Sequence, residues 1–101
     1  MHFVYILHSA SADKYYVGQT PDIETRLLFH NHLAENSFTS RYRPWELLRT
    51  IPVNNRSEAV CIERYIKSRK SRRYIKKLIQ EEQAVEQLLN KFNINPTQSD
   101  G

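Results

Sequence analysis

Residues 16–31 constrain the fold more than any other part of the chain, because a strand end, a turn and a helix are predicted there in immediate succession. Gly18 follows a short β-prone segment and can adopt the positive φ that an exit turn requires. Thr20 is a candidate N-cap, and Pro21 suits the first helical position, where its missing N–H costs nothing. We therefore expect a strand that turns at Gly18 into a helix over residues 21–33.

Three segments rich in β-branched and aromatic residues predict strands. Residues 3–7 form a continuous apolar run, which is typical of a strand buried on both faces. A short polar connection separates this run from residues 15–17, so these two segments predict a hairpin. Residues 45–53 predict a third strand, in which Pro52 indicates an edge position or the end of the strand.

The second half of the chain carries helical periodicity. Residues 57–68 predict one helix, and Ser71 is a candidate cap for another. After a break near Gln80 the pattern resumes, so we expect a single domain over residues 1–92 and a disordered tail over residues 93–101. The apolar stripes of the helical segments are Ala59, Ile62 and Ile66; then Tyr74, Ile75, Leu78 and Ile79; and finally Ala84, Val85, Leu88, Leu89 and Phe92.

Positive charge is concentrated in the second half. The chain has a formal net charge of +4 and a sequence pI of 9.4. Between Arg64 and Lys77 Lys and Arg recur without an acidic residue, which suits a phosphate backbone and equally suits a solvated helix face. The string Arg41-Tyr42-Arg43 interleaves arginine with an aromatic ring, which suits nucleic-acid contacts; an exposed loop is the alternative.

Cysteine content and the N-terminus bear on location. Cys61 is the single cysteine, which excludes an internal disulfide and a cysteine-rich zinc site. The apolar run at residues 3–7 is far too short to cross a membrane and lacks the flanks of a signal peptide. We therefore expect a soluble, cytoplasmic protein with no membrane partner.

Two helices carry residues that suit phosphate chemistry. Arg26 and His30 are four residues apart and therefore project from one helical face; an Asp22–Arg26 ion pair and a partly buried His30 are the alternative. Glu63 lies at the edge of an apolar stripe, where a carboxylate needs a partner. That partner is either Lys67, one turn further on, or a divalent cation.

The order and spacing of several short strings resemble the GIY-YIG nuclease superfamily. The strings are Val4-Tyr5-Ile6, Tyr16-Val17-Gly18, Arg26-Leu27-x-x-His30-Asn31 and the later Ser57-Glu58-Ala59-x-x-x-Glu63-x-x-Ile66-Lys67. More narrowly, they resemble its small stand-alone bacterial members, which are similar to the endonuclease subunit of nucleotide excision repair. The resemblance covers roughly residues 2–79. Val4 stands where the first glycine would be, and Val17 replaces the isoleucine of the second string.

This resemblance implies a fold, a cofactor and a site. The fold would be a small α/β domain with a three-stranded antiparallel sheet flanked by helices. The activity would be cleavage of phosphodiester bonds with one divalent cation, Mg²⁺ or Mn²⁺. Tyr5 and Tyr16 match the signature tyrosines, Arg26 the catalytic arginine, His30 a supporting histidine and Glu63 the metal ligand. Whether a tyrosine or His30 is the general base stays open, since His30 has the easier unperturbed pKa, near 6.5.

Three functions are then in competition. The first is a metal-dependent endonuclease acting on branched, damaged or single-stranded DNA, with RNA as another substrate. The second is a non-catalytic nucleic-acid-binding module. The third is a protein-interaction domain that uses the apolar surface around Leu88, Leu89 and Phe92; a helix that covers the core is the alternative for that segment. For either of the first two, the expected nucleic-acid contacts are Arg41, Arg43, Lys67, Arg69, Lys70, Arg72 and Arg73.

Overall fold

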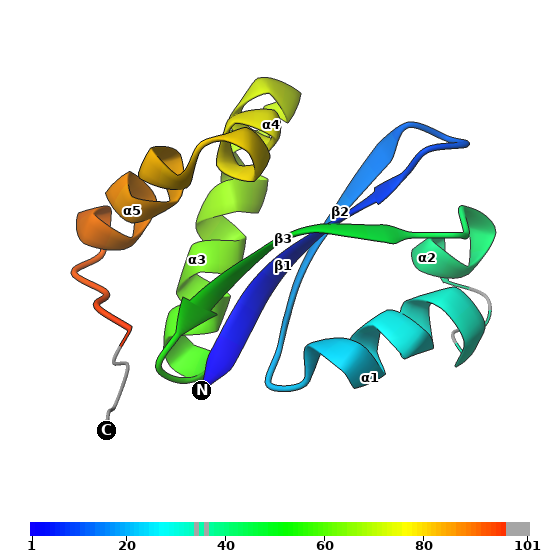
Figure 1. The fold of residues 1–101 in the computed structure, drawn as a ribbon, viewed down its shortest axis with the longest axis horizontal. Helices are drawn as coiled ribbons and strands as arrows, with labels where there is room; N and C mark the ends of the chain where they lie inside the picture. The colour runs from blue at the N-terminus through cyan, green and yellow to red at the C-terminus, as the bar shows by residue number, and fades with distance from the viewer. Residues whose placement is uncertain (34, 36, 97–101) are drawn as a thin grey trace.

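The computed structural model describes residues 1–33, 35 and 37–96 of the 101-residue chain. Strands β1 (His2–Ser9), β2 (Lys14–Thr20) and β3 (Glu46–Val53) form one antiparallel sheet in the order β2-β1-β3 (Figure 1). β1 is the central strand, which explains why its run Val4, Tyr5, Ile6 and Leu7 is buried throughout. The predicted α/β class with a three-stranded antiparallel sheet is confirmed.

Helices lie on both sides of the sheet. α1 (Ile23–Leu28), the π-helical turn η1 (Phe29–Leu33) and the short α2 (Phe38–Arg41) lie on one side. α3 (Arg56–Arg69), α4 (Arg72–Gln80) and α5 (Glu82–Lys91) lie on the other side (Figure 1). The sheet therefore separates two groups of helices.

The alternation of side chains along β1 divides the interior into two cores. Val4 and Ile6 face the larger core, which α3, α4 and α5 cover, whereas Tyr5 and Leu7 face a smaller core under α1. The strand register places Leu7 opposite Tyr16, so Tyr5 and Tyr16 share the face toward α1. This face carries the residues discussed below.

The first helix begins and ends differently from the prediction. Its N-cap is Asp22, whose side chain accepts a hydrogen bond from the Thr25 backbone N–H at 3.2 Å. The Thr20 hydroxyl instead accepts from the Asp22 N–H, and Pro21 therefore precedes the cap. An aspartate cap competes well with threonine because its carboxylate also suits the helix dipole. The helix then widens into the π-helical turn at Phe29.

Of the other local predictions, those for the cap of α4 and for Pro52 are confirmed, and the one for segment 34–44 is not. Ser71 caps α4 as predicted, accepting from the Tyr74 N–H at 3.0 Å, and Asn55 caps α3. Pro52 lies next to the end of edge strand β3, as expected. The segment 34–44, expected to be a loop, contains α2, which a reciprocal capping box at Ser37 and Ser40 stabilises.

The C-terminal helix covers the larger core. Leu88 and Leu89 are buried against it, so the apolar stripe proposed as a binding surface closes the core instead. Ile94 is buried there too, although it falls in the tail expected to be disordered; residues 97–101 of that tail lie outside the described residues. No helix among the described residues has the length and apolar character needed to cross a membrane.

Candidate active site

A chain of hydrogen bonds joins three buried side chains beneath α1. The hydroxyl of Tyr5 lies 2.8 Å from His30 Nε2, and His30 Nδ1 lies 2.9 Å from the hydroxyl of Thr39. His30 and Thr39 are each 3% exposed. The histidine therefore has a protein partner at both ring nitrogens.

The environment of His30 keeps the imidazole neutral. Burial, followed by the positive charges of Arg26 and Arg43, lowers the pKa of His30 to about 4. A neutral imidazole donates from one nitrogen and accepts at the other. The phenol of Tyr5 can therefore donate to Nε2 while Nδ1–H donates to Thr39.

The Tyr5 hydroxyl is the point at which the candidate residues converge. Burial raises its pKa most strongly, and the neighbouring Tyr16 adds to this effect. Arg26 lowers the pKa of the same hydroxyl and Glu63 raises it, so a guanidinium from α1 and a carboxylate from α3 both act on one phenol. The charges of Arg26 and Glu63 are thus both close enough to the Tyr5 hydroxyl to influence its pKa.

Tyr16 contacts residues from both groups of helices and from β1. Its ring centroid lies 6.3 Å from that of Tyr5 and 4.8 Å from that of His30. On its other side the ammonium of Lys67, on α3, lies 5.7 Å from the ring centroid, within cation–π range. α3 packs along the edge strand β2, which explains how its side chains reach a face of the sheet that α3 does not cover.

Arg26 is directed into the site. It lines a small pocket with Tyr5 and Leu27, and its guanidinium lies 5.1 Å from the ring centroid of Phe29. The alternative ion pair with Asp22 is absent among the described residues, because the Asp22 carboxylate bonds Thr25 instead. The Arg26 guanidinium therefore keeps its donors available for an anionic ligand.

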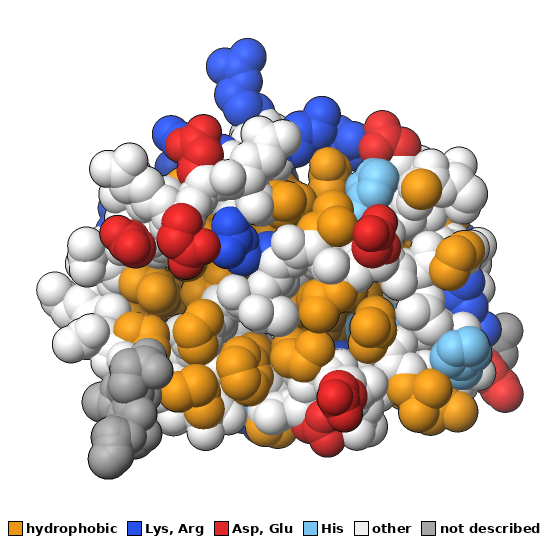
Figure 2. Space-filling view, viewed as in Figure 1, with side chains coloured by type: hydrophobic (Ala, Val, Ile, Leu, Met, Phe, Trp, Pro, Cys, Tyr) orange, Lys and Arg blue, Asp and Glu red, His pale blue; other side chains and the backbone are white. Residues whose placement is uncertain are grey.

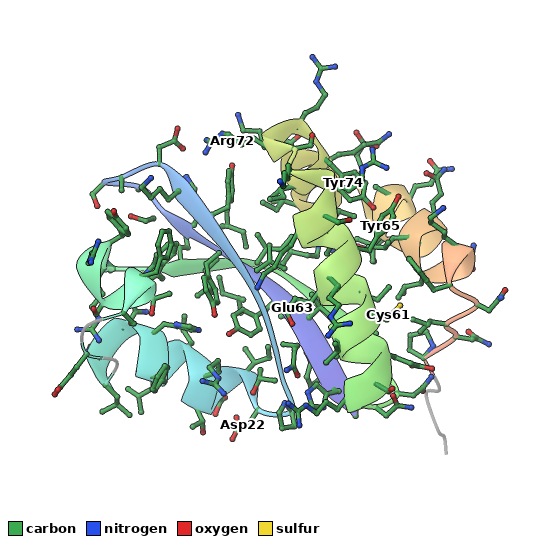
Figure 3. The ribbon with its side chains drawn as sticks, turned by 180° about the vertical axis from the view of Figure 1, so that it is seen from behind. Asp22, Cys61, Glu63, Tyr65, Arg72 and Tyr74 are labelled. Carbon is green, nitrogen blue, oxygen red and sulfur yellow. The ribbon has the colours of Figure 1, made fainter. Side chains whose placement is uncertain are left out.

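Glu63 is the one carboxylate among the candidate site residues, and therefore the candidate metal ligand. Figure 3 shows it on the flank of α3 that faces the sheet, with Cys61 and Tyr65 on the opposite flank. Its side chain is 20% exposed, and Oε2 accepts a hydrogen bond from Lys67 at 2.7 Å, so the predicted ion pair is present. No group of three or more His, Cys, Asp or Glu that could hold a metal occurs among the described residues.

Gly18 has a role that the sequence analysis did not predict. It lies within β2 directly opposite Tyr5, not in an exit turn. A Cβ at Gly18 would overlap the Tyr5 hydroxyl and lie 2.6 Å from its Cζ and 3.0 Å from Cε2 of Tyr16. Glycine is therefore required so that both phenol rings can lie across the strand.

Positioning residues also escaped the sequence analysis. Arg43 Nε donates to the carbonyl of His30 at 2.8 Å, and the Trp45 indole donates to the carbonyl of Thr39 at 2.7 Å. The amide side chain of Asn31 both donates to and accepts from the Trp45 backbone. These bonds hold η1 and α2 against the start of β3. Asn31 had a sequence signal as part of the string that includes His30, and Arg43 had one for another role, as an expected nucleic-acid contact.

The predicted nucleic-acid contacts are distributed over several surfaces. Arg43 is engaged with the backbone at His30, and Arg69 lies against the rings of Tyr65 and Tyr74. The other predicted contacts are exposed: Arg41, Lys67, Lys70, Arg72 and Arg73. A separate cavity of about 730 Å³ on the far flank of α3 is lined by none of the candidate catalytic residues.

Comparisons with known proteins identify the family of the chain. Residues 1–79 match the GIY-YIG catalytic domain. A UPF0213 protein of Lactococcus lactis subsp. cremoris (strain SK11) is 33% identical over 78 residues, which cover 77% of this chain and 79% of that protein. No solved structure matches the chain. GIY-YIG domains are generally endonucleases and typically use a divalent metal, so a nucleic-acid substrate is implied. The resemblance of the sequence strings is thereby confirmed, and the chain belongs to the GIY-YIG family of nuclease domains.

Proposed function

We propose that this protein is a metal-dependent endonuclease that hydrolyses phosphodiester bonds in structured or single-stranded DNA, with RNA as an alternative substrate. The observation that supports this most is the hydrogen bond between His30 and the Tyr5 hydroxyl, whose pKa also responds to the charges of Arg26 and Glu63. A packing tyrosine needs none of these partners. Together they supply a cation for phosphate, a proton acceptor and a carboxylate for a metal.

Arg26 would bind the phosphodiester before and during attack. Its planar guanidinium can donate two parallel hydrogen bonds to non-bridging oxygens, which gain negative charge as water adds. The apolar side chains beside it, Leu27 and Leu47, restrict water and strengthen this interaction. Arg26 therefore both positions the phosphate and stabilises the transition state.

Tyr5 and His30 would carry the proton of the attacking water. Tyr5 Oη passes its proton to Nε2 of neutral His30 and takes one from the water, so the phenol never has to ionise freely at neutral pH. Thr39 accepts from Nδ1–H and holds the imidazole in the tautomer that this transfer requires. In this mechanism Tyr5 is the group nearest the water. Because its low pKa disfavours the imidazolium, His30 holds the proton only during the attack and then releases it.

Glu63 would hold the divalent cation. Carboxylate oxygen suits Mg²⁺ or Mn²⁺, and with one protein carboxylate most of the ligands would be water and substrate oxygens. When bound, the cation supplies Lewis-acid stabilisation of the leaving oxygen. Lys67 neutralises the carboxylate in the meantime.

The test compares Glu63→Gln with Glu86→Gln, a matched change on the exposed surface of α5. We expect Glu63→Gln to lower Mg²⁺- or Mn²⁺-dependent cleavage of duplex, flap, junction and single-stranded substrates by about 100-fold or more, since a bound metal contributes several kcal/mol. Binding measured in a chelator should be retained, and Glu86→Gln should behave as wild type. If the wild type cleaves none of these substrates yet binds them, a non-catalytic binding module is the better interpretation.

Repair or processing of structured DNA in the cytoplasm is part of the same proposal. Cys61 is free, and a chain with one cysteine gains nothing from an oxidising compartment.

A further inference from the structure

A second pocket adjoins the candidate active site. It has a volume of about 290 Å³ and lies where the β1–β2 hairpin, α2 and the start of α4 meet. Its walls include the ring of Phe38 and the cationic side chains of Lys14, Lys70 and Arg72. This volume is near the lower end of the range for small-ligand sites, about 300–1,000 Å³.

Phe38 is an exposed ring held by other rings. It is 46% exposed, yet its centroid lies 6.4 Å from that of Tyr16 with the planes inclined by only 26°. Tyr42 and Trp45 hold it from other directions, at 5.0 and 6.0 Å between centroids. A large aromatic that is fixed in place and partly open to solvent is suited to stack against a ligand. Because Tyr16 belongs to the candidate active site, Phe38 joins the pocket to that site.

The walls of this pocket carry more positive than negative charge. Among the residues that the structure describes, Lys14 and Lys70 have no ion-pair partner. Arg72 is oriented by the carboxylate of Asp13 at 2.9 Å and lies 4.9 Å from the ring centroid of Tyr15. The Lys14 ammonium lies 5.3 Å from the ring centroid of Tyr42 and, like that of Lys70, is not neutralised by a carboxylate of the described residues. A ring flanked by such ammonium groups matches a nucleotide, which presents a flat base and a phosphate.

We propose that this pocket binds an unpaired nucleotide of the substrate strand, next to the phosphate that is cleaved. The base stacks on Phe38, and the phosphate of the same nucleotide meets Lys14 and Lys70. A base inside a duplex is already stacked on both faces, so this contact selects single-stranded or frayed segments. The inference rests on the proposed function and specifies its substrate class: a nucleic acid with an unpaired nucleotide beside the cut.

The test scans one abasic position along a single-stranded DNA oligonucleotide and measures binding by fluorescence anisotropy in a chelator. For the wild type we expect one position at which loss of the base weakens binding roughly 5- to 150-fold, the range for one stacked base. Phe38→Leu, which keeps apolar bulk, should bind the intact and abasic strands alike. Phe29→Leu removes an exposed ring that lies against Arg26 and does not line the pocket, so it should keep the wild-type sensitivity.

Photocross-linking keeps the proposal testable if Phe38→Leu fails to fold. A strand with 5-iodouracil at the sensitive position should form an adduct on Phe38 of the wild-type protein, identified by mass spectrometry. The proposal is overturned if no abasic position matters, if Phe29→Leu removes the sensitivity, or if the adduct lies elsewhere. If this proposal fails, the proposed metal-dependent cleavage is unaffected. If one abasic position weakens binding but the protein never cleaves the strand, the nucleotide pocket stands and the proposed endonuclease activity is wrong.

Discussion

His30 connects the chemistry of the site to the stability of the fold. Burial, Arg26 and Arg43 lower its pKa to about 4, against an ordinary value near 6.5. The folded protein therefore binds fewer protons at this position than the unfolded chain between those two values. The resulting stabilisation is fully present above pH 6.5 and is lost as the pH falls toward 4.

We expect acidification from pH 7 to pH 4 to remove about 3 kcal/mol of unfolding free energy through His30. His30→Gln should unfold more easily at pH 7 but lose less stability on acidification, as measured by urea denaturation across that range. The matched control is His32→Gln, an exposed residue in the same turn, which should keep the wild-type pH dependence. Parallel curves for wild type and His30→Gln would contradict the assignment.

At this scale the sequence predicted a set of residues and, apart from Lys67 beside Glu63, not their partners. Tyr5, Tyr16, Arg26, His30 and Glu63 could be chosen from letters and spacing, and their roles stay predictions. Their partners are brought in by tertiary contact: the Thr39 hydroxyl, the carbonyl that binds Arg43, and the missing Cβ of Gly18. Spacing along a chain does not reveal which side chains meet across a sheet.

Among the secondary-structure elements, Arg49 attaches two helices to the sheet. From β3 its guanidinium donates to the carbonyls of Leu78 and Ile79 at 2.7 and 2.9 Å, and to the carboxylate of Glu82 at 2.8 Å. The two carbonyls belong to the last turn of α4, where no intrahelical donor remains. Arg49 thus fixes the junction of α4 and α5, just where the match to the family ends.

Arg49→Met should lower the free energy of unfolding by about 2 kcal/mol, because two partly buried carbonyls lose a charged donor. Glu82→Gln tests the ion pair alone and should cost less than about 1 kcal/mol, since its side chain is 71% exposed. Both values come from urea denaturation at neutral pH. Equal effects from the two variants would mean that the ion pair, not the carbonyl contacts, holds the junction.

Elements were predicted better than their boundaries. Strands and long helices follow from hydrophobic periodicity, which is why the sheet and α3 to α5 were anticipated. The start of α1 depended on a competition between two cap residues, Thr20 and Asp22, that composition alone does not decide. α2 has four residues and is held by caps and by Trp45, so periodicity could not reveal it.

On the scale of the whole molecule, positive charge is unevenly placed. Figure 2 shows a face whose lower half is largely hydrophobic, with Lys and Arg gathered along its upper edge. Seen from behind, Glu63 and Arg72 lie on the flank of α3 and α4 that faces the hairpin (Figure 3). Arg56 and Arg64 line the cavity on the other flank of α3. Cations on both flanks of α3 are therefore candidates for contact with a nucleic acid.

The salt dependence of binding distinguishes these surfaces. Because Lys14 and Lys70 meet one phosphate, removing both should reduce the slope of log K against log salt by about 0.7 for a single strand. We expect that reduction from Lys14→Gln combined with Lys70→Gln, and little change in slope from Arg56→Gln combined with Arg64→Gln. Both double variants remove two positive charges, so the overall electrostatic attraction falls equally and only the position of the lost charges differs.

Anisotropy titrations of single-stranded DNA at several salt concentrations give the slopes. If the arginine variant alone loses slope, the far flank of α3 binds the strand; if both lose equally, attraction is diffuse and neither flank forms a defined track.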